Sequence, residues 1–188
     1  MLLEAPKYSE RIRFDFDGEK SLYFADRRRF GEVVFSEDWE KEPEIAALGV
    51  EATHRDLSGE YLRTAFRGRS APVHSILLSQ KYVSGLGNIY VTEALFAAGI
   101  RPTKPCGRIA DDKLEALSKS IRQVISQSIE HRGYSMSTYV DALGKKGRSQ
   151  LFSKAYGKEG LPCPRCKTLF KRVVLGGRGV VFCKSCQR

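Results

Sequence analysis

The 188-residue sequence lacks long apolar runs. A membrane-spanning helix needs about 18 consecutive apolar residues, and no window of this sequence comes near that length, so no transmembrane segment is expected. Its start, Met1–Glu4, has neither the basic region nor the apolar region of a secretory signal. Cysteine is scarce, with five residues, and in a chain without an export signal these favour metal binding over disulfides. The apolar content of 41% is enough for a core, which excludes wholesale disorder. We therefore expect a soluble intracellular protein of one domain with a small appendage.

Acidic residues are nearly absent from the C-terminal part of the chain. Residues 145–188 hold 12 Lys and Arg but a single acid, Glu159, so this segment alone carries a formal charge of +11. The whole chain carries +10, which leaves −1 for residues 1–144. A cationic patch this concentrated is typical of proteins that bind a polyanion, and we favour nucleic acid. The simpler alternative is a well-solvated basic tail.

The N-terminal part of the sequence has a strand pattern. Residues 11–16 (RIRFDF) alternate polar and apolar, and the Asp-Gly pair that follows is typical of a hairpin turn. Residues 21–24 and 32–35 continue as two further short strands. Three strands are too few to form a sheet with a protected core. We therefore interpret residues 1–42 as the C-terminal part of a β-sandwich, so that the sequence begins within this domain.

From residue 43 to residue 144 the pattern is helical, and we predict an all-α domain. One helix is expected to begin at Ser58 and reach Phe66, and another to begin at Val73. A third should run over residues 89–98, where Gly99 and a following proline form a stop signal.

The longest helix is predicted over residues 112–132, because its apolar residues recur three and four positions apart. These residues are Leu114, Leu117, Ile121, Val124, Ile125 and Ile129. A capping box formed by Asp112 and Glu115 is expected to begin this helix. We interpret it as core scaffold that carries no chemistry.

Four cysteines are paired at the spacing of a zinc site. Cys163 and Cys166 form one CxxC pair, and Cys183 and Cys186 form a second after 16 intervening residues. Each CxxC turn brings two sulfurs together, so two turns supply the four thiolates of a tetrahedral zinc. With all four ligands from the protein, no position is left for water, and we expect one structural Zn²⁺. The fifth cysteine, Cys106, stands alone and is expected to be an ordinary half-buried thiol.

Between the two cysteine pairs the sequence predicts a β-hairpin. Residues 171–175 and 180–182 have strand composition, and the segment Gly176-Gly177-Arg178-Gly179 joins them. We expect Arg178 at the tip of a zinc-fixed hairpin, where a guanidinium flanked by glycines can meet a phosphate. The alternative is a polar turn residue without a ligand.

Two glycines lie directly before the helix predicted over residues 89–98. The backbone N–H groups and the dipole of a helix start form an anion site. Gly85 and Gly87 permit close approach, and Asn88 can cap the helix or donate its amide to a phosphate. A tight turn between packed helices is the alternative interpretation.

Together, these segments resemble the bacterial formamidopyrimidine-DNA glycosylase family, which is related to endonuclease VIII. The resemblance covers nearly the whole chain. It rests on residues 26–31 (DRRRFG), 80–93 (QKYVSGLGNIYVTE), 94–100 (ALFAAGI), 156–160 (YGKEG) and 176–188 (GGRGVVFCKSCQR). It implies a β-sandwich, a helix–two-turn–helix domain and a zinc finger that together bend DNA and flip out an oxidised purine. The family then cleaves the glycosidic bond and nicks the strand.

The resemblance also implies roles for individual residues. Arg28 and Phe30 resemble the pair that fills the gap left by the flipped base, the ring replacing lost stacking and the guanidinium pairing with the orphan base. Without the resemblance, Phe30 would be interpreted as a core residue at a strand end. Asn88 resembles the family's phosphate-binding asparagine, and Arg69 a basic DNA-contacting position. Arg178 resembles the zinc-finger arginine that grips phosphates flanking the lesion and takes part in strand cleavage.

Four features depart from the family pattern. The family's nucleophile is an N-terminal proline that forms a Schiff base at the deoxyribose C1′, with an adjacent glutamate as acid. Met1–Glu4 offers neither, and the catalytic lysine of the sandwich is carried onto no residue of this chain. His74 stands where the family usually has lysine, and residues 132–135 (RGYS) occupy its G-G-S-T loop near the damaged base. The preferred lesion is therefore not predicted.

We thus predict an α+β protein: partial β-sandwich strands in residues 1–42, a helix–two-turn–helix all-α domain in residues 43–144, and a four-Cys zinc-finger β-hairpin in residues 145–188. The resemblance implies base-excision repair of oxidised purines by a bifunctional DNA glycosylase/AP lyase. We expect a monomer that binds damaged double-stranded DNA in the nucleoid of the bacterial cytoplasm, away from membranes.

The chain itself is expected to supply damaged-DNA binding and to lack the nucleophile. It would then be either a truncated copy of an active enzyme or a non-catalytic zinc-dependent DNA-binding protein. A third alternative, a zinc ribbon for RNA or ribosomal partners, is disfavoured by the motif in residues 26–31.

Overall fold

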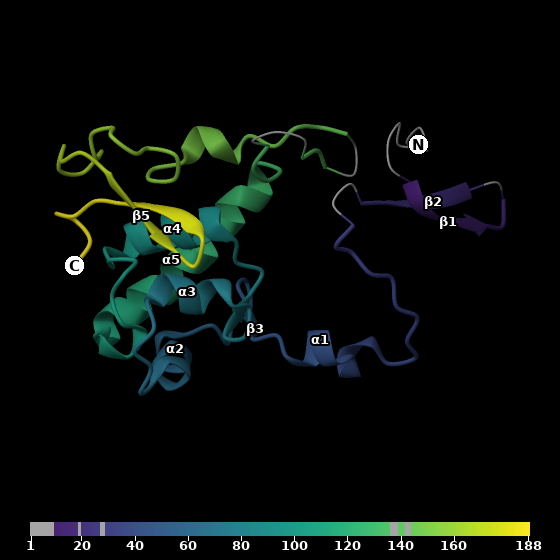
Figure 1. Cartoon of the computed structure of the whole chain (residues 1–188), viewed down its shortest axis with the longest axis horizontal. Helices are drawn as coiled ribbons and strands as arrows, with labels where there is room; N and C mark the ends of the chain where they lie inside the picture. Colours follow the sequence, from purple (N-terminus) through teal and green to yellow (C-terminus); the bar gives the residue numbers. More distant parts are fainter. Residues whose placement is uncertain (1–9, 19, 27–28, 136–138, 142–143) are drawn as a thin grey trace.

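The computed structural model describes residues 10–18, 20–26, 29–135, 139–141 and 144–188. These residues form a small β-hairpin, a helical body and a C-terminal β-hairpin, in that order along the chain (Figure 1). The α+β class predicted from the sequence is confirmed. Within these ranges, every helix is too short or too polar to cross a membrane.

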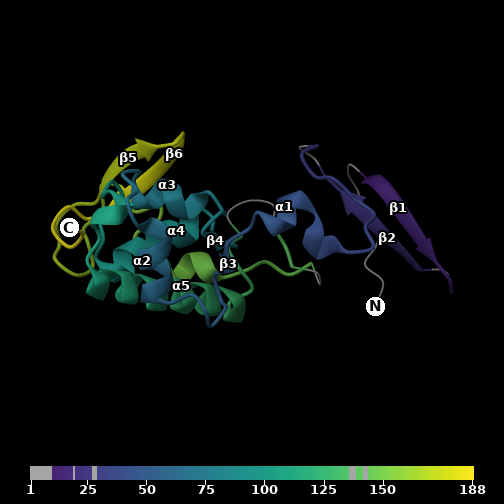
Figure 2. The same cartoon turned by 90° about the horizontal axis from the view of Figure 1, so that it is seen from below.

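The N-terminal hairpin consists of β1 (Glu10–Phe16) and β2 (Lys20–Ala25), paired antiparallel. Figures 1 and 2 show it standing away from the helical body, at the far end of a connecting segment. That segment contains the 3-10 turn η1 (Trp39–Lys41) and the short helix α1 (Pro43–Ala46). Large apolar side chains of the hairpin are consequently exposed, as with Phe16 at 59%.

The third predicted strand, residues 32–35, is not formed. The side chain of Val34 is 64% exposed and that of Phe35 is 95% exposed. A strand needs a neighbouring strand edge to accept and donate its backbone hydrogen bonds. In the part of the chain that the structure describes, no strand pairs with these residues. Composition alone predicted a strand here, but strand formation depends on a partner.

Four main helices and two short strands build the helical body. They are α2 (Gly59–Phe66), α3 (Val73–Leu78), α4 (Asn88–Ala98) and α5 (Asp111–Glu130), with β3 (Val50–Glu51), β4 (Val83–Ser84) and the 3-10 turn η2 (Cys106–Arg108). The strands β3 and β4 pair in parallel, and α5 packs against both α2 and α4. The helix α4 is enclosed by its neighbours, and its residues 91–96 are all buried.

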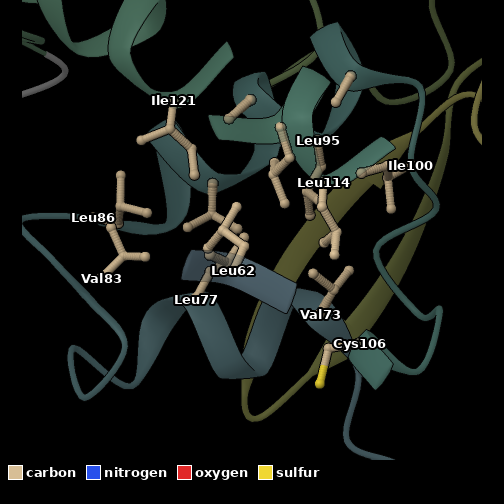
Figure 3. Close-up of a cluster of buried hydrophobic side chains, with 14 of the residues drawn as sticks. Leu62, Val73, Leu77, Val83, Leu86, Leu95, Ile100, Cys106, Leu114 and Ile121 are labelled. Atoms are coloured by element: carbon tan, nitrogen blue, oxygen red, sulfur yellow. The ribbon is translucent and has the colours of Figure 1, made fainter. Parts of the chain in front are cut away.

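The core of this body lies between the helices, where apolar side chains converge (Figure 3). Prominent members, each at most 2% exposed, are Leu62, Val73, Leu77, Val83, Leu86, Leu95, Ile100, Leu114 and Ile121. Truncation of one such leucine to alanine typically costs about 2–5 kcal/mol of folding free energy. This cluster therefore fixes the position of α3 relative to α4. The N-terminal ends of these two helices form part of the candidate site.

The helix ends follow from local chemistry, with one correction. Ser58 caps α2 by accepting a first-turn backbone N–H at 3.1 Å, and Gly99 ends α4 in the left-handed conformation, with φ of 71°. The predicted capping box of α5 is wrong, because Ala110 precedes the helix and gives no side-chain cap. Glu115 instead accepts the backbone N–H of Gly59 at 3.1 Å. A contact between two helices has replaced the local one.

The C-terminal hairpin pairs β5 (Lys171–Leu175) with β6 (Arg178–Phe182) antiparallel. Its turn is Gly176-Gly177, with φ of 54° and 74°, the positive values that a two-residue hairpin turn requires. Arg178 is therefore the first residue of β6, opposite Leu175, and does not sit at the tip as predicted. The hairpin lies over α4 in Figure 1, and β6 contacts this helix.

Candidate nucleic-acid interface and metal centre

The four predicted zinc ligands come together. The sulfur atoms of Cys163, Cys166, Cys183 and Cys186 all lie within 4.8 Å of one another. The Cys166 and Cys183 sulfurs are 3.4 Å apart, and those of Cys163 and Cys186 are 3.9 Å apart. A tetrahedron with Zn–S bonds of about 2.3 Å places its sulfurs about 3.8 Å from one another, so the cluster fits zinc. The site is a structural zinc centre, because four thiolates complete the tetrahedron without water.

The thiols of this cluster compete for ionisation. Hydrogen bonds from Thr168 lower the pKa of Cys166 to about 6, so this thiol loses its proton more readily than Cys183 or Cys186. The hydrogen bond between Cys186 and Cys166 raises the pKa of Cys186 to about 12. Burial raises the pKa of Cys183. A bound dication removes this conflict, since it stabilises four thiolates at once.

Arg165, inside the first CxxC pair, fixes the finger to the end of α4. Its guanidinium donates to the carbonyl oxygens of Phe96 at 2.9 Å and Ala97 at 3.1 Å. These carbonyls belong to the last turn of a helix, where no partner is available within the helix and the dipole favours a cation. The guanidinium also lies 4.4 Å from the centre of the Phe96 ring, which packs edge-to-face with Phe170.

The end of the chain makes a second attachment. Gln187 is fully buried: its side-chain amide donates to the Ile100 carbonyl at 2.8 Å and its oxygen accepts the Cys183 N–H at 2.8 Å. The Arg188 N–H donates to the Gly99 carbonyl at 3.1 Å. The zinc finger is thus anchored to α4 by buried polar contacts, and not only by the metal.

Sequence reasoning missed a buried carboxylate, that of Glu93. The side chain lies in α4 at 6% exposure and accepts hydrogen bonds from Ser153 and the segment after it, which precedes the finger. A usable signal was present in the sequence, because Glu93 is the single charged residue in the apolar run of α4. Arg165 and Gln187 gave no comparable signal, since their partners are backbone carbonyls far along the chain.

The glycine turn does bring Asn88 to the start of α4. Gly87 is the N-cap residue and is exposed, with open space where a side chain would begin, so a ligand can approach the backbone at the helix start closely. Asn88 does not cap the helix with its side chain, contrary to one of the two predicted roles. Its amide Nδ2 donates to the Gly179 carbonyl of β6 at 3.0 Å, and its Oδ1 lies 2.8 Å from His74 Nε2. The helix start and the zinc hairpin therefore meet at Asn88.

Two predicted DNA-binding arginines have exposed side chains. Arg178 immediately precedes Gly179, so it stands on the hairpin beside the Asn88 contact. Arg69 follows α2, where its Nε donates to the Ala65 carbonyl at 2.8 Å and its guanidinium lies 4.7 Å from the Tyr82 ring centre. These contacts orient the Arg69 side chain.

Phe30 lies on the N-terminal side of the molecule, beyond β2, which Figure 1 shows well separated from β5 and α4. Its side chain is 80% exposed, so it is not the core residue that composition alone would suggest. Asp26 holds the turn by accepting the backbone N–H groups of Phe30 and Gly31, each at 2.7 Å. The companion residue of the predicted pair, Arg28, lies outside the described residues.

Comparison with known families matches two parts of the chain. Residues 48–140 match the formamidopyrimidine-DNA glycosylase H2TH domain, and residues 160–188 match the zinc finger found in FPG and IleRS. The second match covers all four cysteines of the cluster. Together with the sulfur geometry, it confirms the predicted zinc site.

Curated relatives and solved structures are formamidopyrimidine-DNA glycosylases. The Brucella ovis protein is 44% identical over 172 residues, covering 88% of this chain and 59% of the relative. The MutM (FPG) structure from Thermus thermophilus is 33% identical with a TM-score of 0.87, covering 97% of this chain and 70% of that one. The Lactococcus lactis Fpg, solved with DNA containing an abasic site, is 32% identical with a TM-score of 0.86. The match covers 100% of this chain and 69% of that one.

The chain thus spans about three fifths of the length of the Brucella relative and 70% of the Thermus structure. The similarity includes the helical body, the zinc finger and the glycine turn that joins them at Asn88. On these grounds the chain belongs to the formamidopyrimidine-DNA glycosylase (Fpg/MutM) family.

Proposed function

We propose that residues 1–188 bind damaged double-stranded DNA as the lesion-recognition part of a base-excision enzyme for oxidised purines. The observation that carries this proposal is the meeting of two anion-binding elements at one place. The accessible helix start at Gly87 and Asn88 touches the zinc hairpin at Gly179, next to Arg178. Because backbone N–H groups and a guanidinium both favour phosphate oxygens, the two elements can hold one stretch of DNA backbone.

The charge distribution supports the same assignment. Residues 145–188 carry a formal +11, and four thiolates with one Zn²⁺ would still leave the segment strongly cationic. In this proposal Gly87, Asn88 and Arg178 bind phosphates near the lesion, and Arg69, whose guanidinium lies 4.7 Å from the ring centre of Tyr82, binds a further phosphate. Such contacts position the protein on the duplex without reading its sequence.

Lesion recognition is assigned to the N-terminal side. Phe30 is an exposed aromatic on a turn fixed by Asp26, so it can enter the stack at a flipped base without unfolding the protein. Arg28 is its proposed partner, pairing with the orphan base. Lactococcus lactis Fpg has been solved in complex with DNA containing an abasic site and with DNA containing Fapy-dG, and we propose that this chain recognises the same class of lesion.

Residues 1–188 are proposed to lack the glycosylase and lyase steps when they are on their own. Met1–Glu4 (MLLE) provides no prolyl amine for a Schiff base, and Arg178 assists strand cleavage only where a nucleophile is supplied. We further propose domain limits of 1–42, 43–144 and 145–188, a monomeric state, and association with the bacterial nucleoid. The alternative, a zinc-dependent DNA-binding protein without any lyase role, shares every binding residue.

Binding of zinc-loaded protein to matched duplexes, intact or with one abasic-site analogue, tests the proposal. We expect tighter binding to the damaged duplex and a steep loss of affinity with salt, about 0.9 in log K per phosphate contact for each unit of log salt. Failure to bind either duplex at low salt would overturn it. Borohydride trapping on an abasic site then tests the chemistry: we expect no covalent adduct, and an adduct would assign lyase activity to these residues.

A further inference from the structure

His74 is a buried histidine next to the proposed phosphate site. It is the second residue of α3, is 0% exposed, and its backbone N–H donates to the Pro102 carbonyl at 3.3 Å. Its Nε2 lies 2.8 Å from Oδ1 of Asn88, and its Nδ1 has no hydrogen-bond partner among the described residues. A buried ring nitrogen without a partner costs free energy. The retained contact with Asn88 is therefore the polar interaction that this side chain makes.

The contact with the Gly179 carbonyl identifies which way round the Asn88 amide lies. A carbonyl oxygen can only accept, so the NH₂ group of Asn88 faces Gly179 at 3.0 Å and the amide oxygen faces His74. His74 must then carry its proton on Nε2 and donate it to Asn88. The opposite orientation of the amide would set two carbonyl oxygens against each other.

Gly179 itself is held in place. It lies in β6, where it pairs with Val174 of β5 in the antiparallel ladder. The position of the Gly179 carbonyl relative to Asn88 is thus fixed from the hairpin side, while His74 fixes the amide from the helix side. The amide sits between these two partners.

We infer that His74 is a positioning residue: it donates Nε2–H to Asn88 and so directs the Asn88 NH₂ group towards the zinc hairpin and the DNA phosphate. An NH₂ group has two hydrogens, and the Gly179 carbonyl takes one. The other is left for a phosphate oxygen beside Arg178. This inference rests on the proposed function, because it assigns His74 a part in the DNA binding proposed for Asn88.

The tautomer of His74 can be measured without DNA. In protein labelled with ¹⁵N in histidine, the ring nitrogens give different shifts for the two neutral tautomers. We expect the Nε2–H form for His74, identified by the signal that disappears in His74→Gln. The Nδ1–H form would overturn the inference even if DNA binding were normal.

A double-mutant cycle tests the action through Asn88. His74→Leu removes the donor and should weaken binding to the abasic-site duplex about fivefold to tenfold, roughly what one neutral hydrogen bond is worth. His74→Gln, which can donate an amide N–H, should recover most of that loss. In the Asn88→Ala background, His74→Leu should have no further effect, because the group that it positions is gone.

The control is Thr92→Val, which changes another buried polar side chain; the Thr92 hydroxyl has no hydrogen-bond partner among the described residues, so the change removes no hydrogen bond to Asn88. It should leave the affinity unchanged. The same loss for His74→Leu with and without Asn88 would show a general packing effect and overturn the inference. Failure of the wild-type protein to bind any duplex would instead overturn the proposed function, and the tautomer measurement separates the two outcomes.

Discussion

The carboxylate of Glu93 in α4 accepts the backbone N–H of Tyr156 at 2.7 Å, although 63 positions separate the two residues. The same carboxylate accepts the N–H groups of Lys154 and Ala155, each at 2.9 Å, and the Ser153 hydroxyl at 3.0 Å. Residues 153–156 therefore wrap a single buried anion, as a phosphate is held by a loop of N–H groups. The segment that leads into the zinc finger is fixed to α4 by this contact.

Glu93→Gln should destabilise the protein by about 1–3 kcal/mol, because the amide presents one acceptor where the carboxylate presents two and sets an NH₂ group against backbone donors. Urea unfolding followed by circular dichroism measures the change. The control is Glu130→Gln, at the exposed end of α5, which should shift stability by less than about 0.5 kcal/mol. Equal effects for the two substitutions would contradict the assigned role of Glu93.

Cys183→Ser should abolish stoichiometric zinc binding and unfold the finger. Ligand bonds to zinc supply most of the folding free energy of so small a module, about 10–16 kcal/mol for zinc-finger peptides. Colorimetric release of zinc from purified protein measures the metal content. Cys106→Ala is the matched control, since Cys106 is also buried but lies outside the cluster, and it should retain one zinc per chain. Retention of zinc by Cys183→Ser would argue against the four-thiolate site.

The metal ligands and the four main helices could be predicted because their signals are local. A CxxC pair fixes two sulfurs within one turn, and three- and four-residue spacing fixes the face of α5. Where the sequence failed, the deciding partner was distant. Residues 32–35 have strand composition, yet in the described chain no strand edge accompanies them. Glu115 was expected to cap its own helix and instead binds Gly59 of α2.

The same limit applies to the candidate site. The glycine turn and Asn88 could be identified from the sequence as an anion-binding helix start. The contact of Asn88 with Gly179 joins residues 91 positions apart and could not be inferred from spacing. Arg178 was predicted at the hairpin tip but is the first residue of β6, because the two-residue Gly176-Gly177 turn sets the strand register.

Phe30→Ala should reduce the preference for damaged over intact duplex by about tenfold, which is the order of one lost base–aromatic stack. It should not change stability, because the ring is 80% exposed. Parallel titrations of the two duplexes give the ratio of affinities. Phe35→Ala, at 95% exposure on the same segment, is the control and should leave that ratio unchanged. An equal loss on both duplexes for Phe30→Ala would refute its insertion into the base stack.

Arg178→Ala should weaken binding to every duplex by a similar factor, because a phosphate contact carries no sequence or lesion information. The slope of log K against log salt should become less steep by about 0.9, the contribution of one phosphate contact. The charge-matched control is Arg55→Ala, whose side chain is 92% exposed and lies outside the proposed site. A change in slope for both variants would point to net charge, and not to a specific contact, as the cause.

His74 should make the stability of the protein depend on pH. Burial lowers the pKa of His74 below its ordinary 6.5, and the hydrogen bond with Asn88 acts in the other direction to a smaller extent. Below pH 6.5, His74 therefore binds a proton in the unfolded chain and remains neutral in the folded chain until the pH is lower. Its contribution to stability is complete above that pH and declines as the pH falls, by at most about 1.4 kcal/mol per pH unit for one proton.

Urea midpoints measured between pH 7.5 and pH 5.5 should consequently fall more steeply for the wild type than for His74→Gln, which has no titrating group at this position. The zinc thiolates also take up protons in acid, but they do so equally in both proteins, so the difference between the two curves isolates His74. Thr92→Val is the control: it changes another buried polar side chain but no titrating group, so it should keep the pH dependence of the wild type. Superimposable curves for the wild type and His74→Gln would mean that the folded protein accommodates the charged imidazole, against the buried environment that the structure gives it.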